Sequence, residues 1–468
     1  MALVSLPGSQ LTAAIGRPEA IEASIPAAVR ALLESLWSNG QAAYVVGGSL
    51  RDVLLGRRPA DWDLASDARP ERVIELFPGA VYENAFGTVA VRRDGETFEI
   101  TTFRSDHDYA DFRRPHHVEF GDSIELDLAR RDFTINAMAW GARAGGPAAF
   151  LDPYDGLVDL TAGVLRAVGD PRARFEEDAL RMVRAVRLAT TLEFGIETAT
   201  LAGIQARAAL VEHLSGERIA IELDKLLAAR APSVGLRLLS DTGLLAPISA
   251  DLAAQRGIPQ NKIPGEDLWD HTLRSVDAVR PDRPIVRLAA LLHDIGKPST
   301  FADGHFVRHD AVGADLAGAF LDRLHAPRAV RDRIVALVRH HMFSYEPNWS
   351  DAAVRRFIVK MNAIGPGALD ELLELREADN VGSGLPAGAG RLAELRARVQ
   401  AELEAGVALD RRRLALDGAD LMTELELGEG PILGRILDRL VEAVIVDPSL
   451  NQRPTLLTLA RGMLADER

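Results

Sequence analysis

Length, composition and charge limit the classes to which this protein can belong. The chain has 468 residues, of which 47% are hydrophobic and 26% are charged, as is typical of a globular protein. At about 150 residues per domain, this length predicts roughly three domains. The absence of cysteine excludes disulfides and cysteine nucleophiles, so His, Asp and Glu must supply the ligands of any metal ion. The formal net charge of −14 argues against nucleic-acid binding over the whole surface and predicts that any RNA contact is a local basic stripe.

The first 28 residues, which we interpret as an N-terminal extension, lack the charged-then-apolar pattern of a secretory signal. No apolar run in the chain approaches the ~20 residues that a bilayer-spanning helix needs. We therefore expect a cytoplasmic protein without a membrane partner.

Short strands and helices alternate between residues 42 and 140. The apolar run at residues 42–46 predicts a buried strand. Gly47-Gly48-Ser49 ends this strand, and residues 50–55 continue as a helix. This first block is therefore expected to be an α/β domain.

Two further strands are predicted at residues 87–93 and 97–104. Asp94-Gly95 between them is a two-residue hairpin signal. We interpret residues 106–123, which follow the second strand, as a mobile loop.

Helical periodicity dominates after about residue 172. Separate helices are expected at 175–191, 199–212, 216–230 and 233–242, and further helical blocks at 268–380 and 391–468. We therefore predict an α+β protein that consists of an N-terminal extension (1–28), an α/β head (29–172), a helical neck (173–257), a helical body (266–381) and a helical tail (391–468).

Asp61 and Asp63 are two residues apart in Ala60-Asp61-Trp62-Asp63-Leu64. On a strand, residues i and i+2 face the same way, so both carboxylates would project together and Trp62 would point to the other face. Two carboxylates this close repel unless a cation lies between them. Oxygen ligands of this kind suit Mg²⁺ that also binds substrate phosphates.

Three further residues of the first block are candidates for the same site. Glu99 lies in a strand whose neighbours Phe98 and Ile100 face the opposite side, and a third carboxylate allows two ions to be held. The backbone at Gly48 can approach phosphate closely at the start of a helix, and Arg51 follows on that helix.

Two motifs of the first block resemble one known family. Val46-Gly47-Gly48-Ser49-Leu50-Arg51-Asp52 with Asp61-Trp62-Asp63 is similar to the nucleotidyltransferase motif of the DNA polymerase beta superfamily, in particular of the class II tRNA nucleotidyltransferase and bacterial poly(A) polymerase family. Arg130 to Met138, Arg-Arg-Asp-Phe-Thr-Ile-Asn-Ala-Met, resembles the second motif of that family. The resemblance implies that Arg131 and Asp132 contact the triphosphate and ribose of a nucleotide.

The neck contains a helical pattern that could read a base. If residues 176–187 form one helix, Asp178, Arg181, Arg184 and Arg187 descend one face, and Glu177 with Arg181 forms an i,i+4 ion pair. The structural interpretation is a surface helix stabilised by ion pairs. The alternative is that an Asp acceptor beside an Arg donor selects cytosine and adenine, which show an amino donor beside a ring-nitrogen acceptor.

The family resemblance supports the second interpretation, because Glu-Asp-x-x-Arg is the templating motif of the class II family. It implies that Asp178 and Arg181 select the base and that Arg184 and Arg187 face the triphosphate. Gly216-Glu217-Arg218-Ile219 with Glu222 resembles a later family motif, which we interpret as structural support.

A different motif lies in the predicted body. Leu291 to Lys297, Leu-Leu-His-Asp-Ile-Gly-Lys, resembles the signature of HD phosphohydrolases. With His271 upstream and Asp379 downstream, His293 and Asp294 complete that family's metal-binding set, and His309 and His340 are candidates for a second ion. Such ligands suit Ni²⁺, Mn²⁺ or another divalent transition metal. Whether the domain hydrolyses a phosphate ester is left open by the sequence.

Taken with these motifs, the resemblance implies CCA addition, in which a tRNA 3′-hydroxyl attacks the α-phosphate of CTP or ATP and pyrophosphate leaves. A poly(A) polymerase is the first alternative, but it should carry a strongly basic terminal extension, which this sequence does not show. A CC-adding enzyme is the second, but residues 111–115 and 118–120 match the loop that CC-adding members lack in part. A hydrolase that repairs RNA 3′ ends is the alternative from another class.

Overall fold

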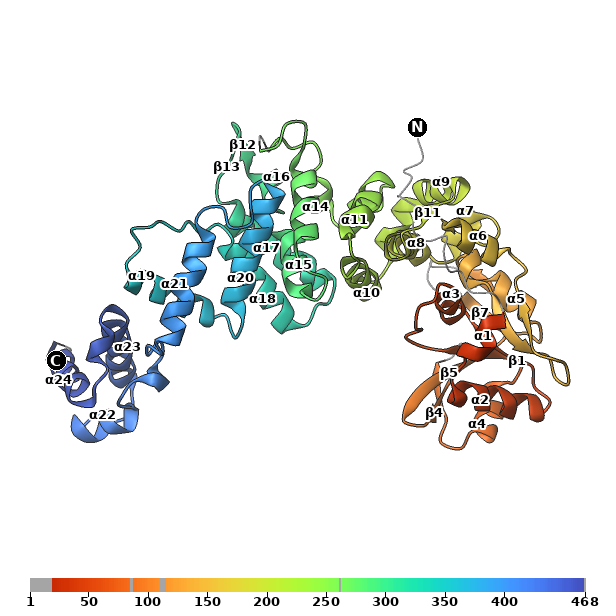
Figure 1. Cartoon of the computed structure of the whole chain (residues 1–468), viewed down its shortest axis with the longest axis horizontal. Helices are drawn as coiled ribbons and strands as arrows, with labels where there is room; N and C mark the ends of the chain where they lie inside the picture. Colours follow the sequence, from red (N-terminus) through yellow and green to blue (C-terminus); the bar gives the residue numbers. More distant parts are fainter. Residues whose placement is uncertain (1–18, 85–86, 110–114, 261, 467–468) are drawn as a thin grey trace. The chain divides into compact units, whose positions relative to one another are not determined.

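The computed structural model describes residues 19–84, 87–109, 115–260 and 262–466. The chain divides into two compact units, with the boundary between Ala253 and Ala254, and each is described here by itself (Figure 1). Residues 1–18 of the predicted N-terminal extension and residues 110–114 of the predicted loop lie outside the described residues. The domain boundaries predicted from the sequence remain predictions.

The N-terminal unit contains a seven-stranded sheet in the order β3-β4-β5-β2-β1-β8-β9. Its strands are β1 (Ala43–Val46), β2 (Asp63–Ser66), β3 (Val81–Asn84), β4 (Thr88–Arg93), β5 (Glu96–Thr102), β8 (Ala139–Ala142) and β9 (Ala149–Leu151). Neighbouring strands are antiparallel except β2 and β5, which run parallel. Strand β1 is flanked by β2 and β8 and all its residues are buried, as its apolar run predicts.

The hairpin between β4 and β5 is confirmed. Asp94 and Gly95 have φ values of 52° and 83°, and the two-residue turn that suits the twist of a hairpin requires positive φ at both positions. The prediction of a loop at residues 106–123 is wrong, because β6 (Arg104–Tyr109) pairs with β7 (Pro115–Phe120) in an antiparallel hairpin. The polar sequence of these strands lacks the hydrophobic alternation that marks a strand packed on a core.

Helices cover the sheet and lead into the site. α2 (Ala27–Ser38) and α3 (Gly48–Leu54) pack on β1, and α4 (Pro70–Leu76) packs on β4 and β5. The remaining helical segments of the head are α1 (Glu19–Ser24), α5 (Ile124–Ala129), η2 (Thr134–Asn136) and α6 (Gly156–Ala162). Tyr44, Phe103 and Leu128 belong to the core that joins α5 to the sheet.

The neck residues are mainly helical, as predicted. Their helices are α7 (Pro171–Glu177), α8 (Leu180–Leu192), α9 (Thr198–Arg207), η3 (Ala208–His213), α10 (Gly216–Leu227), α11 (Pro232–Asp241), α12 (Leu245–Ile248) and α13 (Ala250–Ala253). Strands do not stop entirely at residue 172, since β10 (Val164–Leu165) pairs with β11 (Gly195–Ile196).

One predicted helix of the neck is two helices. The chain leaves helical geometry at Asp178, whose φ and ψ are −148° and 105°. The Asp178 carboxylate accepts a hydrogen bond from the backbone N–H of Leu180 at 3.1 Å. Asp is a preferred residue for satisfying the unpaired N–H groups at a helix start, so Asp178 ends α7 and caps α8 instead of lying within one helix.

Over residues 254–260 and 262–466, the second unit is helical apart from one short strand pair, β12 (Phe301–Ala302) with β13 (His305–Phe306). Its first helices are α14 (Leu268–Ala278), α15 (Pro284–Leu292), α16 (Lys297–Thr300), α17 (His309–Arg323), α18 (Arg328–His340), α19 (Asp351–Asn362), α20 (Ala368–Gly382) and α21 (Leu392–Glu404). Helices α14, α15, α18 and α20 pack on one another. His271 and Asp379 lie on α14 and α20, His293 and Asp294 directly follow α15, and His341 directly follows α18.

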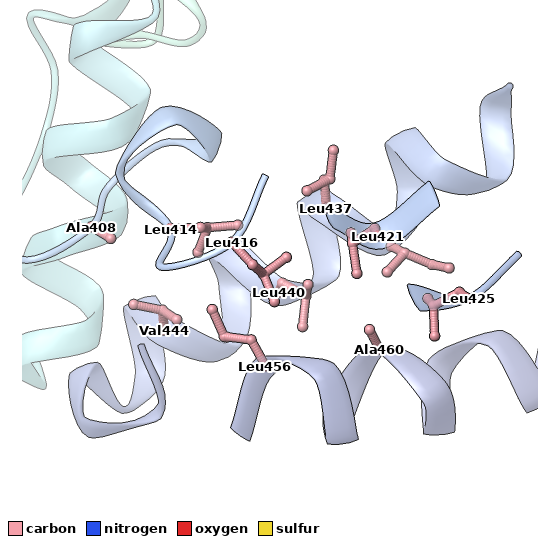
Figure 2. Close-up of a cluster of buried hydrophobic side chains, with 11 residues drawn as sticks. Ala408, Leu414, Leu416, Leu421, Leu425, Leu437, Leu440, Val444, Leu456 and Ala460 are labelled. Atoms are coloured by element: carbon pink, nitrogen blue, oxygen red, sulfur yellow. The ribbon is translucent and has the colours of Figure 1, made fainter. Parts of the chain in front are cut away.

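The C-terminal helices form their own apolar cluster. They are η4 (Arg411–Arg413), α22 (Gly418–Glu424), α23 (Pro431–Val446), η5 (Pro448–Leu450) and α24 (Arg453–Asp466). Figure 2 shows Leu421, Leu440 and Leu456 of three of these helices within the cluster, and all three are fully buried. Burying each such side chain stabilises the fold by about 1.5–3 kcal/mol. Among the residues that the structure describes, no helix is long and apolar enough to cross a membrane.

Candidate active site and metal centre

The pairing of β2 with β5 brings two of the predicted carboxylates together. Asp63 and Glu99 are register partners, and register partners on adjacent strands have side chains on the same face. Phe98 and Ile100 on the other face of β5 are buried. Asp61 lies just before β2 and not within it, so the expectation that Asp61 and Asp63 share one strand is wrong.

Electrostatics nevertheless link the three carboxylates. Asp63 is exposed at the start of its strand, yet crowding by protein atoms raises its pKa, and the charge of Asp61 raises it further. The pKa of Glu99 is also raised, first by partial burial and then by Glu83, Asp63 and Asp61. Mutual repulsion of this kind is what a bound divalent cation relieves.

The turn before α3 lies against the same site. Gly47 has φ of 78°, and a Cβ there would lie 2.9 Å from Arg131 Nη1 and 3.6 Å from Asp63 Oδ2. A side chain would therefore be strained and would crowd both groups. Gly48 begins α3. The charge of Arg131 partly offsets the raised pKa of Asp63.

A hydrogen-bond chain joins the two head motifs. Arg51 Nη1 donates to Asn136 Oδ1 at 2.7 Å, and Asn136 Nδ2 donates to Asp132 Oδ1 at 3.1 Å. Asp132 Oδ2 lies 2.9 Å from Arg184 Nε. Burial alone would raise the pKa of Asp132, but Arg184 and Asn136 hold it below its ordinary value. Asp132 is therefore a buried anion, and its ion pair with Arg184 connects the neck to the head site.

Asp127, a buried acid that the sequence analysis did not single out, binds the two arginines of the second motif. Asp127 of α5 is fully buried and accepts hydrogen bonds from Arg130 Nη2 at 2.7 Å and Arg131 Nη2 at 3.2 Å. Burial would raise its pKa, yet these two guanidinium groups lower it. Its place one helical turn before the two arginines is the signal that could have revealed it.

Asp178 and Arg181 do not descend one helix face together, because the helix breaks between α7 and α8. Asp178 Oδ2 accepts a hydrogen bond from Arg218 Nη2 at 2.7 Å. Arg181 Nη1 donates to Glu177 Oε2 at 2.6 Å, which is the i,i+4 pair that the surface-helix interpretation predicts. Arg181 Nη2 donates to the carbonyl of Arg130 at 2.9 Å, so Arg181 reaches the second head motif.

Arg184 and Arg187 have different surroundings. Arg184 is 46% exposed and pairs with Asp132, and its charge partly offsets the raised pKa of Asp63. Arg187 Nε instead donates to Glu222 Oε2 at 2.8 Å, and both side chains of this pair are largely buried. Arg218 and Glu222, one turn apart on α10, thus hold Asp178 and Arg187.

In the second unit, the predicted HD residues converge in the interior. His271, His293, Asp294 and Asp379 are all buried. His271 Nε2 lies 3.1 Å from His293 Nε2, 3.3 Å from Asp294 Oδ2 and 3.4 Å from Asp379 Oδ1. Such a set of imidazole nitrogens and carboxylate oxygens suits a divalent transition metal.

Hydrogen bonds around this cluster fix its side chains. His293 Nδ1 contacts the carbonyl of Ala290 at 2.7 Å, and Arg376 Nη1 donates to Asp379 Oδ2 at 2.8 Å. Lys297 Nζ lies 2.6 Å from Asp294 Oδ2. Although burial would raise the pKa of Asp294, the nearby imidazoles and Lys297 hold it well below its ordinary value. Partners of this kind orient metal ligands.

The choice of His340 as a further ligand is wrong. His309 and His341 are buried and, with Asp294, form a second group that could hold a metal ion, whereas His340 lines a separate surface cavity of about 500 Å³. Neighbouring helical residues point about 100° apart, so only one of the two histidines faces the interior. Ile334, Leu337 and Val338 are buried on α18, and this periodicity indicates His341.

The fold and the site define a nucleotidyltransferase head joined to a helical region with an HD metal centre. Family models agree with this class. The poly A polymerase head domain matches residues 43–166, the probable RNA and SrmB-binding site of polymerase A matches residues 193–255, and the HD domain matches residues 249–381. The HD and nucleotidyltransferase domains imply the use of divalent metal ions.

Comparison with individual proteins identifies the family. The CCA-adding enzyme of Lactococcus lactis subsp. cremoris is 32% identical over 450 residues, which cover 93% of this chain and 96% of that protein. That of Lactiplantibacillus plantarum is 32% identical over 94% of this chain and 97% of that protein. The crystal structure of the Bacillus stearothermophilus CCA-adding enzyme in complex with CTP has a TM-score of 0.65 at 28% identity, covering 97% of this chain and 99% of that one. The chain belongs to the CCA-adding enzyme family.

Proposed function

We propose that this enzyme adds C, C and A to the 3′ end of tRNA with CTP and ATP as substrates and pyrophosphate as the leaving group. The observation that carries the proposal is the register pairing of Asp63 with Glu99; the charges of Arg131 and Arg184 act on the Asp63 carboxylate. It occurs in a chain whose relatives over nearly its whole length are CCA-adding enzymes. Because the cytoplasm contains tRNA, CTP and ATP, we also propose that the enzyme acts there.

Asp61 and Asp63 would hold Mg²⁺, which fits their exposed oxygens. The pKa of Asp63 is raised first by crowding of protein atoms and then by the charge of Asp61, and a bound cation would relieve the second effect. When bound, Mg²⁺ would neutralise phosphate charge. Glu99 is placed on the same face as Asp63 and would accept the proton of the attacking 3′-hydroxyl. Its raised pKa makes it a better proton acceptor than an ordinary carboxylate.

The nucleotide would be held from three sides. The backbone at Gly48 and the side chain of Arg51 would contact phosphate oxygens at the start of α3. Arg131 and Arg184 would bind the triphosphate, and Asp132 would accept a hydrogen bond from the ribose. A triphosphate role for Arg187 requires that it contact the substrate in addition to Glu222.

Asp178 and Arg181 would select the base. A carboxylate has lone pairs beyond those that Arg218 and the Leu180 N–H occupy, and a guanidinium has further N–H donors. Asp178 can therefore accept from the exocyclic amino group of cytosine or adenine while Arg181 donates to the ring nitrogen. Guanine and uracil show the reverse pattern and would set an acceptor against Asp178 and a donor against Arg181, which is costly in a partly buried site.

The test is nucleotide incorporation into three tRNA transcripts that end before CCA, after the first C and after the second C, with CTP and ATP supplied separately. We expect CTP to complete both C positions and ATP to add a single A only to the transcript ending in CC. Repeated ATP addition would identify a poly(A) polymerase, and failure to add A would identify a CC-adding enzyme. Activity in Asp61→Ala would show that the proposed carboxylate site is wrong.

A second activity is favoured by the buried HD cluster. We propose that His271, His293, Asp294 and Asp379 bind a divalent transition metal such as Ni²⁺ or Mn²⁺, and that this centre hydrolyses a phosphate ester at an RNA end. Hydrolysis of a 2′,3′-cyclic phosphate by the full chain with either metal, lost in His293→Ala, is the expected result. Hydrolysis that survives in His293→Ala would remove this activity from the proposal.

A further inference from the structure

A surface cavity of about 500 Å³ lies in the second unit, where it is lined mainly by the end of α18, by α19 and by the segment that connects them, residues 341–350. Its described lining includes none of the proposed metal ligands. Cavities of roughly 300–1,000 Å³ are typical of small-molecule sites. The size therefore suits a ligand of nucleotide dimensions and excludes a folded partner or a duplex.

One wall of this cavity is aromatic and consists of Phe343, Trp349 and Phe357. The ring centroid of Phe357 lies 5.2 Å from that of Phe343 and 5.8 Å from that of Trp349. Phe357 is buried, whereas the other two side chains are partly exposed. Aromatic rings at these separations attract one another, so the buried ring holds the two outer rings in place. The aromatic wall is thus a fixed surface on which a planar ring system can stack.

The other lining side chains give the cavity a positive charge. Arg339, Arg356 and Lys360 line it, and Asp310 is the one carboxylate among the lining residues that the structure describes. The whole chain has a formal net charge of −14, so this excess of cations is local. A cavity of this kind attracts an anion.

The cations of the cavity are available to a ligand. Arg339 pairs with Asp315, and Arg356 pairs with Glu442, but all four side chains are at least 44% exposed. Exposed ion pairs are weak, so both guanidinium groups can turn to a phosphate. Lys360 is exposed and forms no ion pair within the part of the chain that the structure describes.

We propose that this cavity binds a nucleoside phosphate, with its base stacked on the aromatic wall and its phosphate held by Lys360, Arg339 and Arg356. Aromatic side chains stack on the face of any base, and guanidinium and ammonium groups pair with phosphate oxygens. An apolar ligand would leave the cations unused, and an inorganic anion would leave the aromatic wall uncovered. A free nucleotide and a nucleotide within a single RNA strand share this chemistry. The site is additional to the nucleotide site of the head and does not depend on it.

Photoaffinity labelling locates the site without depending on turnover. The full chain is irradiated with an azidoadenosine triphosphate, digested and analysed by mass spectrometry. We expect labelled peptides from the head and, separately, from residues 339–361, and AMP should protect the second group from labelling. Label that is confined to the head would overturn the inference.

Two variants test the two parts of the site. Trp349→Leu removes a stacking surface, and Lys360→Gln removes an exposed cation. In each, the AMP concentration that halves the label on residues 339–361 should rise about tenfold. Arg328→Gln removes a 93% exposed cation from α18 outside the cavity and is the matched control, for which that concentration should not change.

Circular dichroism shows whether each variant is folded, and Lys360→Gln alone carries the test if Trp349→Leu is not. Unchanged protection by AMP in a folded Lys360→Gln would overturn the inference.

Competitors separate the chemistry of the ligand from its source. Adenosine and inorganic phosphate should each protect about tenfold more weakly than AMP, because each engages only one part of the site. Adenosine that protects as well as AMP would contradict the phosphate contact and with it the inference. Stronger protection by AMP than by a single-stranded RNA oligonucleotide would identify a free nucleotide as the ligand, and the reverse order would identify a nucleotide of RNA.

Discussion

Arg218 of α10 donates a hydrogen bond to Asp178 Oδ2 over 2.7 Å, so the carboxylate that is proposed to read the base is held by a second helix. Asp178 Oδ1 at the same time accepts from the N–H of Leu180. Because Asp178 lies at the break between α7 and α8 and not within a helix, these two hydrogen bonds fix its orientation. Arg218 is accordingly expected to be a positioning residue for base selection.

Arg218→Ala should reduce kcat/KM for both CTP and ATP by about tenfold to a hundredfold, since a hydrogen bond to a charged group contributes about 1.5–3 kcal/mol. Discrimination against UTP and GTP should fall as well, because a mobile Asp178 no longer presents a fixed acceptor. Steady-state kinetics with all four nucleotides measure both effects. Arg218→Lys should restore part of the selectivity, and a variant that loses rate for every nucleotide equally would show a merely structural role.

Glu99→Gln should lower kcat for nucleotide addition by about a hundredfold or more, since general base catalysis contributes 10²–10⁴-fold. KM for CTP should change little, because Glu99 is not proposed to bind the nucleotide. Single-turnover kinetics on tRNA ending before CCA separate the two parameters. The exposed Glu96 at the start of the same strand provides the control Glu96→Gln, which should retain parental rates. Full activity of Glu99→Gln would remove the proposed role.

Asp127→Asn should destabilise the N-terminal unit by about 3 kcal/mol at pH 7, because it leaves Arg130 and Arg131 without their buried partner. The folded-state pKa of Asp127 is lowered relative to an unfolded value of about 3.9. The stabilisation is therefore fully present above that value and is lost as the pH falls through the folded-state pKa. The difference between variant and parent should shrink correspondingly in acid.

Hydrogen exchange read by mass spectrometry on peptides of the N-terminal unit measures this difference at each pH. Asp122→Asn serves as the control, since the Asp122 side chain is 84% exposed in its ion pair with Arg69 and such pairs contribute at most about 1 kcal/mol. A loss in Asp127→Asn that is equal at pH 7 and below pH 3 would contradict the assignment.

Variants of the Arg187–Glu222 ion pair can distinguish a structural role of Arg187 from a role in substrate binding. Glu222→Gln alone should destabilise the unit by about 3–5 kcal/mol, because it leaves Arg187 largely buried without an anion. The double variant Arg187→Met with Glu222→Leu should recover much of this loss, since apolar residues of similar volume can replace a buried ion pair. If Arg187 also contacts the triphosphate, the stable double variant should show a raised KM for both CTP and ATP. An unchanged KM would restrict Arg187 to its structural contact.

Local sequence signals predicted those parts of the molecule that depend on neighbouring residues. The hairpin at Asp94-Gly95 follows from the φ values that these two residues tolerate, and the burial of Phe98 and Ile100 beside the exposed Glu99 follows from strand alternation. The polar strands β6 and β7 could not be predicted in this way, because the pairing of their backbones is not visible in the pattern of side chains.

The sequence by itself determined the class of protein and most of the chemically active residues, because motifs such as Arg130 to Met138 and His293-Asp294 are contiguous. Only the tertiary structure decided which partner each one has. A parallel strand pair places Asp63 beside Glu99. Asp178 accepts a hydrogen bond from Arg218 of another helix, and His341, not His340, lies in the buried cluster. The physical reason is that a side chain's partner is fixed by packing between segments distant in sequence, and neither composition nor spacing records that packing.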